Sequence, residues 1–284
     1  IPALIWQPIL RGIILNVRPR KSAANYAKVW MANGSPLAVY TKAQAKNLQA
    51  RLGDAIDVRY AMRYGEPAVA RQLEAMKADG CNRILLAPLY PQYSGATTAT
   101  VVDEAFRALA GMRWQPALRT LPAYHDDPAY ISALAATLNA QLAKLDFEPD
   151  AIVASFHGMP ERTLHQGDPY HCHCQKTARL LSEALGKPLT IAFQSRFGRA
   201  KWLEPSTEDT IKRLAAEGKT KIALFAPGFS ADCLETLEEL AMQGKEQFEE
   251  AGGERYAYLS CLNASEPGMA MLEALIRREL SGWL

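Results

Sequence analysis

The strongest constraint on the fold is that the chain repeats part of its own pattern. When the sequence is compared with itself at an offset of 133 residues, eight positions between Gly34 and Gly65 carry the same residue in both copies. The shared glycines and prolines mark turns, and the shared leucines belong to the helical stretch between them. Two segments with the same order of turns and apolar residues are expected to fold in the same way. The matched pairs are Gly34/Gly167, Pro36/Pro169, Ala45/Ala178, Leu48/Leu181, Leu52/Leu185, Gly53/Gly186, Arg63/Arg196 and Gly65/Gly198.

Strand-like apolar stretches alternate with amphipathic helical stretches in both copies. Examples of the strands are NRILLAPLY, DAIVASFHG and KTKIALFAPGF. This alternation predicts an α/β fold in which helices cover parallel sheets. We therefore expect two similar Rossmann-like lobes at residues 1–125 and 126–284, with a ligand cleft between them and a C-terminal extension that packs back. The strand AIVASFHGMP, which opens the second copy, has no counterpart before Gly34, so the first lobe is expected to lack its first strand.

Charge and cysteine content exclude some classes of function. A formal net charge of +2 over 284 residues is too small to indicate a nucleic-acid partner. Five cysteines without a secretory signal favour reduced thiols and a cytoplasmic protein. The apolar opening stretch, residues 1–21, is interrupted by Pro8 and Arg11 and ends in basic residues. It is typical of a core or lid helix, or of an element that rests on a membrane surface.

Two strand-end loops carry side chains suited to chemistry. His157 follows the apolar strand of the SFHGMP loop, where it could act as a base, bind a metal or simply hydrogen-bond its own loop. In DCLETLEEL, Glu235 and Glu239 are four residues apart and are expected on one face of a helix, either as functional carboxylates or as helix-capping charges. Glu238 is expected to face solvent. A histidine opposite a carboxylate suits a divalent ion such as Fe²⁺.

Aromatic and basic residues occupy the other strand-end loops. Arg63, Tyr64, Tyr90 and Trp202 predict an apolar slot with cationic corners, although each residue alone would more often serve packing. A flat aromatic ligand with carboxylates would fit such a slot.

The most conspicuous candidate metal motif is HCHC at residues 171–174. Zinc sites usually use a wider cysteine spacing and a second cysteine pair, and an iron–sulfur cluster needs four thiolates. The first copy carries Val39 and Thr41 where the second carries Cys172 and Cys174. We therefore favour a plain loop at or just before a helix N-terminus over a metal or cluster site.

Five motifs together resemble the ferrochelatases over nearly the whole chain. They are SFHGMP, GDPYHCHCQKTARLL, LYPQYSGATT, QSRFGRAKWLEPST and PGFSADCLETLEEL. The resemblance implies a two-lobed chelatase that inserts Fe²⁺ into protoporphyrin IX, with Fe²⁺ as substrate metal and no organic cofactor. Gly95 stands where animal family members have a cluster cysteine, so a 2Fe–2S cluster is not expected. Cys233 stands where a histidine is frequent.

The resemblance also implies roles for individual residues. His157 and Glu235 would face each other across the porphyrin and, with Glu239, handle metal and protons. Ser35 would lie near a propionate, and the slot would be lined by Arg63, Tyr64, Tyr90 and Trp202. The apolar N-terminal stretch would form the lip of the pocket and touch the membrane. Alternative interpretations are a chelatase for coproporphyrin or another tetrapyrrole, and a non-catalytic two-lobed binding protein.

Overall fold

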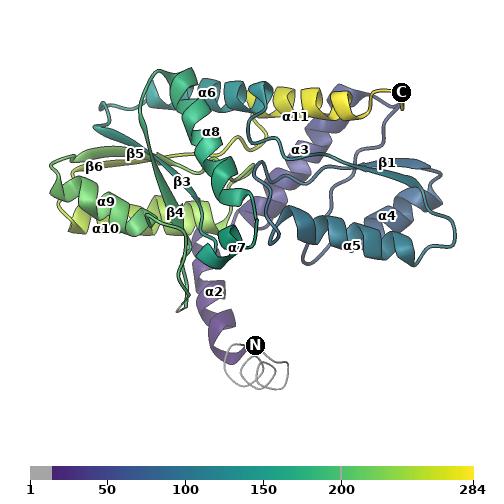
Figure 1. Cartoon of the computed structure of the whole chain (residues 1–284), viewed down its shortest axis with the longest axis horizontal. Helices are drawn as coiled ribbons and strands as arrows, with labels where there is room; N and C mark the ends of the chain where they lie inside the picture. Colours follow the sequence, from purple (N-terminus) through teal and green to yellow (C-terminus); the bar gives the residue numbers. More distant parts are fainter. Residues whose placement is uncertain (1–14, 199) are drawn as a thin grey trace.

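A computed structural model describes residues 15–198 and 200–284, with side chains from residue 22 onward. The chain folds into an α/β molecule with two separate parallel sheets, one at each end (Figure 1). This confirms the predicted fold class. β1 and β2 form the smaller sheet. The elements of this first part of the chain are α2 (Leu15–Val29), α3 (Pro36–Leu52), α4 (Val69–Ala78), β1 (Arg83–Leu86), α5 (Thr98–Ala110) and β2 (Ala117–Thr120).

The larger sheet has four parallel strands in the order β4-β3-β5-β6. The helix η2 is a π-helix, whose turns are wider than those of an α-helix. The elements of this half are α6 (Pro128–Leu142), β3 (Ala151–His157), α7 (Glu161–His165), α8 (Tyr170–Leu185), β4 (Leu189–Gln194), α9 (Thr207–Ala216), β5 (Lys221–Phe225), η2 (Glu235–Gln243), α10 (Gly244–Glu250), β6 (Arg255–Leu259) and α11 (Glu266–Glu279).

The two halves share local structure where the sequence repeats. The amide of Met62 donates to the carbonyl of Pro67 at 2.8 Å, and the amide of Phe193 donates to the carbonyl of Pro205 at 2.9 Å. Both prolines follow cis peptide bonds. The same hydrogen bond therefore closes the same loop in both lobes. Before Gly34, residues 15–29 form α2, so no strand equivalent to β3 occurs in the described chain between residues 15 and 33.

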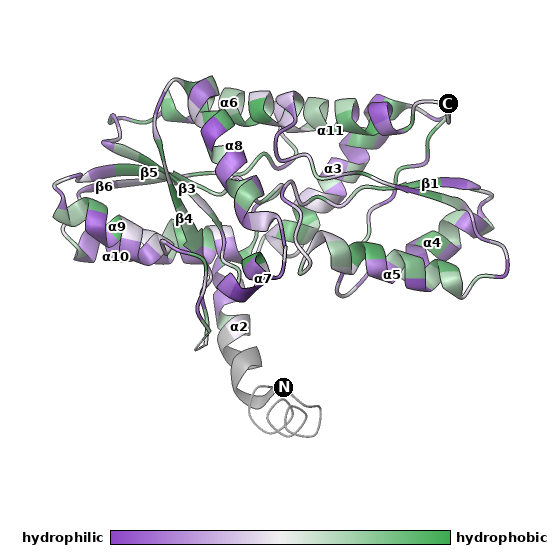
Figure 2. Ribbon diagram, in the orientation of Figure 1, coloured by the Kyte–Doolittle hydropathy of each residue, from purple (hydrophilic) through white to green (hydrophobic). Residues whose placement is uncertain are grey.

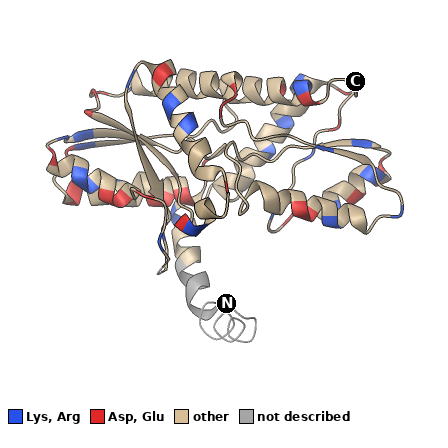
Figure 3. Ribbon diagram, viewed as in Figure 1, with Lys and Arg blue, Asp and Glu red and all other residues tan. Residues whose placement is uncertain are grey.

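The core forms on both faces of the larger sheet. Residues 152–156 of β3 are buried without interruption, as expected for a parallel strand covered on two sides. Ala154 and Phe156 pack with residues of α6 and α8, whereas Val153 packs with Ile211 of α9 and Phe248 of α10. Figure 2 shows that these strands are mainly hydrophobic, while Figure 3 shows charged residues along the outer helices. Alternate residues of β3 therefore point to opposite faces of the sheet, and helices cover both faces.

The C-terminal extension packs back against the molecule, as predicted. Helix α11 lies along α6 and α3 (Figure 1). Arg119 of β2 donates to the carbonyls of Glu279 and Ser281 at 2.7 and 2.9 Å, and its guanidinium lies 4.1 Å from the centre of the Trp283 ring. The end of the extension therefore contacts the smaller sheet, although it follows the larger one in sequence. No helix in the described ranges is long and apolar enough to span a membrane.

Candidate functional site

Two strands of the larger sheet and the helix η2 meet at the carboxyl ends of the strands. β3 ends at His157 and β4 at Gln194, and these two residues are paired in register. The Nε2 group of Gln194 donates to the carbonyl of Glu235, the first residue of η2, at 3.2 Å. Ser155 fixes Gln194 in turn by donating to its Oε1 atom at 2.8 Å. Gln194 therefore ties His157 of β3 to Glu235 of η2, a role that sequence reasoning missed.

Asp232 anchors the loop that precedes the π-helix η2. Its side chain is only 2% exposed, and the carboxylate accepts hydrogen bonds from Tyr258 at 2.7 Å, Thr236 at 3.0 Å and Asn263 at 2.6 Å. Three donors compensate the carboxylate for its loss of water. Asp232 thus holds the segment that carries Glu235.

His157 combines burial with a nearby carboxylate. Its ring lies edge-on to Phe229, with 6.2 Å between ring centres. Burial lowers the pKa of His157, and the negative charge of Glu235 partly opposes that shift. The imidazole is therefore neutral near pH 7 and free to take up a proton. Gly158 is required beside it, because a Cβ atom there would lie 2.6 Å from the carbonyl oxygen of Gln194.

Glu239 lies one turn beyond Glu235 and is held by Ser195. The amide and the hydroxyl of Ser195 donate to its two carboxylate oxygens at 2.6 and 2.5 Å. Burial raises the pKa of Glu239, and the charges of Glu235 and Glu238 raise it further, whereas the Ser195 hydrogen bonds lower it. Within the described ranges, no three histidine, cysteine or acidic side chains converge as a metal site. His157, Glu235 and Glu239 therefore do not form a closed three-ligand cage.

The prediction that Glu238 faces solvent is wrong. Glu238 is 3% exposed, and its carboxylate accepts hydrogen bonds from Lys28 at 2.9 Å and from Gln243 at 2.8 and 2.9 Å. The physical reason is the π-helix, which changes the direction of the side chains relative to the expected α-helix. Helix α2 then covers this side of η2.

The first lobe contributes three of the predicted slot residues. Burial raises the pKa of Tyr90. Tyr64 and Glu235 raise it further and Arg63 lowers it, so each of these three groups lies within electrostatic range of Tyr90. The Arg63 guanidinium lies 4.6 Å from the centre of the Tyr64 ring. Its Nε atom is buried without a hydrogen-bond partner. Arg63, Tyr64 and Tyr90 thus form one group, and Tyr90 is the member within electrostatic range of Glu235.

Ser35 and Trp202 have structural roles in this conformation. The hydroxyl of Ser35 caps α3 by accepting from the amide of Ala38 at 3.4 Å. Trp202 is 7% exposed, and its indole N–H donates to the carbonyl of Phe197 at 3.0 Å. Its ring lies against the backbone of Gly158. The substrate roles implied for Ser35 and Trp202 stay predictions.

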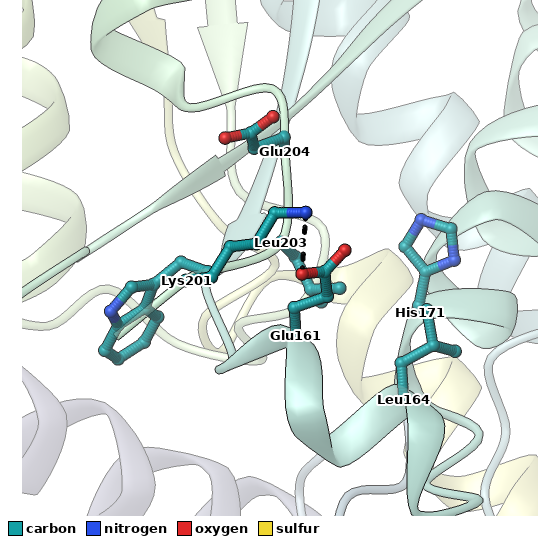
Figure 4. Close-up of a pocket in the computed structure, with 7 residues that line it drawn as sticks. Glu161, Leu164, His171, Lys201, Leu203 and Glu204 are labelled. Atoms are coloured by element: carbon teal, nitrogen blue, oxygen red, sulfur yellow. Dashed lines mark ion pairs between the residues drawn. The ribbon is translucent and has the colours of Figure 1, made fainter. Parts of the chain in front are cut away.

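Trp202 also lines a small pocket behind the His157 loop. Glu161 of α7 and Lys201 form an ion pair of 2.9 Å at its edge (Figure 4). The pocket is separate from the group formed by His157, Glu235 and Tyr90. Its lining residues are Glu161, Leu164, His171, Lys201, Trp202, Leu203 and Glu204.

HCHC lies in the first turn of α8 and not in a loop. The four residues diverge there: Cys172 is exposed, whereas Cys174 is buried. His173 accepts a hydrogen bond from the amide of Tyr93 at 3.2 Å and stacks on His125, with ring centres 3.5 Å apart. The motif therefore joins α8 to two loops of the first half, and its side chains do not converge on a metal.

Because His125 is stacked on His173 and partly buried, we expect the folded protein to lose stability at acid pH. Burial, followed by the proximity of His173, lowers the pKa of His125 from 6.5 to about 4; Asp126 raises it and Lys176 lowers it. As the pH falls, His125 is therefore protonated in the unfolded chain, at its ordinary pKa, before it is protonated in the folded protein. The His125 contribution is fully present above about pH 6.5 and is lost as pH falls toward 4. The shift corresponds to about 3 kcal/mol, which solvent screening of this partly exposed ring reduces to roughly 2 kcal/mol.

Urea unfolding of the wild type and a His125→Phe variant at pH 7, 6 and 5 measures this effect. The variant is expected to lose less stability over that range, because phenylalanine keeps the stacking and does not titrate. Parallel stability losses in the two proteins would contradict the assignment to His125.

Comparisons with known proteins agree with the geometry. A family model described as Ferrochelatase matches residues 1–280. The ferrochelatase of Rhizobium meliloti is 55% identical, with 99% of this chain and 85% of that protein covered. The ferrochelatase of Agrobacterium fabrum is 52% identical over 99% of this chain and 84% of that protein.

Solved structures show the same architecture at low sequence identity. SirB from Bacillus subtilis with Fe³⁺ superposes with a TM-score of 0.64 at 13% identity, over 88% of this chain and 93% of that chain. The sirohydrochlorin chelatase SirB in complex with cobalt gives a TM-score of 0.60 at 11% identity, over 85% and 88% of the two chains. These likenesses show the two-lobed fold.

Proposed function

The chain belongs to the ferrochelatase family, whose reaction inserts Fe²⁺ into protoporphyrin IX to form haem, and we propose that His157 and Glu235 carry out this reaction here. The enzyme is a metal-chelating lyase. The observation that supports the assignment is the placement of a buried neutral imidazole beside a carboxylate, opposite an aromatic and cationic group from the other lobe.

Metallation must remove two protons from the pyrrole nitrogens while Fe²⁺ loses water. A neutral imidazole and an ionised carboxylate can together accept two protons, which balances the reaction. We propose that His157 takes the first proton and that Glu235 guides the cation and takes the second. Imidazole and carboxylate also form a donor set that Fe²⁺ accepts.

Glu239 is proposed to continue the acidic path beyond Glu235. It lies further along η2, and burial raises its pKa above the ordinary value of a glutamate. Such a carboxyl group binds and releases a proton more easily near neutral pH than an exposed one. Ser195 would keep it aligned through two hydrogen bonds.

Tyr90, Tyr64 and Arg63 are proposed to receive the macrocycle. Tyr64 is 76% exposed and Tyr90 is 36% exposed, so both offer aromatic surface to a planar ligand. The buried, unpartnered Nε atom of Arg63 would gain a partner from a porphyrin propionate. Slot walls that bend the macrocycle would expose nitrogen lone pairs to the metal.

We further propose a cytoplasmic enzyme in which residues 1–125 and 126–284 form the two lobes and the apolar opening stretch contacts a membrane surface. Trp30, 58% exposed, and Leu37, 44% exposed, are apolar surface residues that follow that stretch in the sequence. Residues 1–14 lie outside the described residues, as do the side chains up to residue 21.

Anaerobic mixing of the protein with Fe²⁺ and protoporphyrin IX tests the function. The free-base Soret and visible bands are expected to convert to those of haem at a rate proportional to enzyme concentration. Coproporphyrin is expected to react more slowly. Porphyrin binding without metallation would contradict the proposal and favour a binding protein.

A further inference from the structure

Glu238 is a buried carboxylate beside the proposed catalytic pair that the reaction itself does not use. Its side chain is 3% exposed. A carboxylate in such a place is stable only with donors, because it has lost its water. Gln243 supplies two hydrogen bonds, at 2.8 and 2.9 Å, but no charge. Lys28 of α2 supplies the positive charge at 2.9 Å.

Helix α2 has few other attachments. It extends away from the body of the molecule, and the part that contacts the body packs against η2 (Figure 1). For residues 22–29, the part of α2 whose side chains are described, the bond from Lys28 to Glu238 is the sole side-chain hydrogen bond to another element. Lys28 remains 47% exposed, so the ion pair has one buried and one accessible partner.

An aromatic pair lies at the C-terminal end of the docked helix. Tyr26 and Trp30 are in edge-to-face contact, with 6.1 Å between ring centres. Burial is the main cause that raises the pKa of Tyr26. The negative charge of Glu235 and the thiol of Cys233 raise this pKa further. Tyr26 therefore lies within electrostatic range of Glu235, as expected for a residue of a helix that packs against η2. Both aromatic residues also remain partly exposed, at 36% and 58%.

We propose that the Lys28–Glu238 ion pair is a positioning latch that holds α2 against η2 and keeps Tyr26, with Trp30 in contact with it, at the side of η2 where the two rings contact the edge of the porphyrin. The inference rests on the proposed function of Glu235. Lys28 and Glu238 touch no reacting atom and act through the helix that they join. Loss of the latch weakens porphyrin binding and leaves the chemical step intact.

Lys28→Met tests the latch, because it keeps the length of the side chain and removes its charge. Lys28→Arg restores the charge, and Lys42→Met removes an exposed lysine of α3 as a matched control. Hydrogen–deuterium exchange reports on the amides of residues 22–29. Soret titration gives the Kd for protoporphyrin, and steady-state kinetics give kcat and both KM values.

In Lys28→Met we expect faster exchange across residues 22–29 and a Kd and KM for porphyrin raised about tenfold. We expect kcat and the KM for Fe²⁺ to stay within about twofold of the wild-type values. The loss of the contacts made by Tyr26 and Trp30 weakens porphyrin binding and does not affect the chemical step. Lys28→Arg and Lys42→Met are expected to resemble the wild type in exchange and in Kd.

Unchanged exchange in Lys28→Met would overturn the latch, as would loosened amides with an unchanged porphyrin Kd. A fall in kcat at constant Kd would also overturn it, because it would place Lys28 in the chemical step. If the wild type did not metallate porphyrin, the proposed function would fail, while exchange and Kd would still decide whether the latch controls binding.

Discussion

Replacing His157 with alanine is expected to lower kcat for Fe²⁺ insertion by a factor of about a hundred or more, with the Kd for porphyrin changed by less than about threefold. The reason is that the substitution removes the neutral imidazole that accepts a pyrrole proton beside Glu235. The aromatic surfaces of Tyr64 and Tyr90 remain, so binding is retained. Anaerobic stopped-flow spectroscopy separates the two quantities.

His165→Ala is a matched control, since His165 is an exposed histidine of α7 in the same lobe. It is expected to behave as the wild type. Full activity of His157→Ala would show that another group accepts the proton. In the wild type, activity is expected to fall as pH drops through the pKa of His157, which lies below the ordinary value of 6.5 because the ring is buried.

Glu235→Gln is expected to lower kcat/KM for Fe²⁺ by about a hundredfold. Glutamine has nearly the same shape, but it removes the negative charge that attracts the cation and the oxygen that takes up the second proton. The Glu235 charge also raises the pKa of His157. The acid limb of the pH–rate profile is therefore expected to move to lower pH in this variant.

Initial rates at varied Fe²⁺ concentration measure this effect at each pH. Glu246→Gln, an exposed glutamate of α10, serves as the control for loss of a nearby negative charge. An acid limb that does not move in Glu235→Gln would show that Glu235 and His157 are not coupled. An unchanged kcat/KM for Fe²⁺ would remove Glu235 from the reaction.

Much of the site could be predicted because its residues follow strand ends. His157 ends β3, and Glu235 follows β5 after a short loop. The carboxyl ends of parallel strands meet at one edge of a sheet, so two such residues are close whatever the details of the intervening helices. Gln194 also ends a strand of this sheet, and that position is the signal that could have identified it.

Other residues carried no adequate local signal. Glu238 was expected in solvent because the acidic stretch resembles an ordinary amphipathic α-helix. The one hint was Gln243, five residues further on, which is the spacing that a π-helix brings together. Its second partner, Lys28, lies 210 residues away in the sequence, where no periodicity can indicate a contact.

The HCHC motif is the opposite case, because a conspicuous local pattern does not form a site in the structure. Four potential ligands in a row are conspicuous in a sequence, but a helical turn points consecutive side chains in different directions. His173 meets His125 and the amide of Tyr93, whereas Cys174 turns into the core. Proximity along the chain therefore did not produce a common binding site.

The sequence by itself determined the alternation of strands and helices, the repeat that predicts two lobes and the loops at which His157 and Glu235 occur. These properties depend on residues close together in the chain, which explains why local patterns reveal them. Only the tertiary structure decided that Glu238 is buried, that Ser195 holds Glu239 and that Lys28 anchors α2. Burial and hydrogen bonding of a side chain depend on segments distant in sequence, and folding alone brings those segments together.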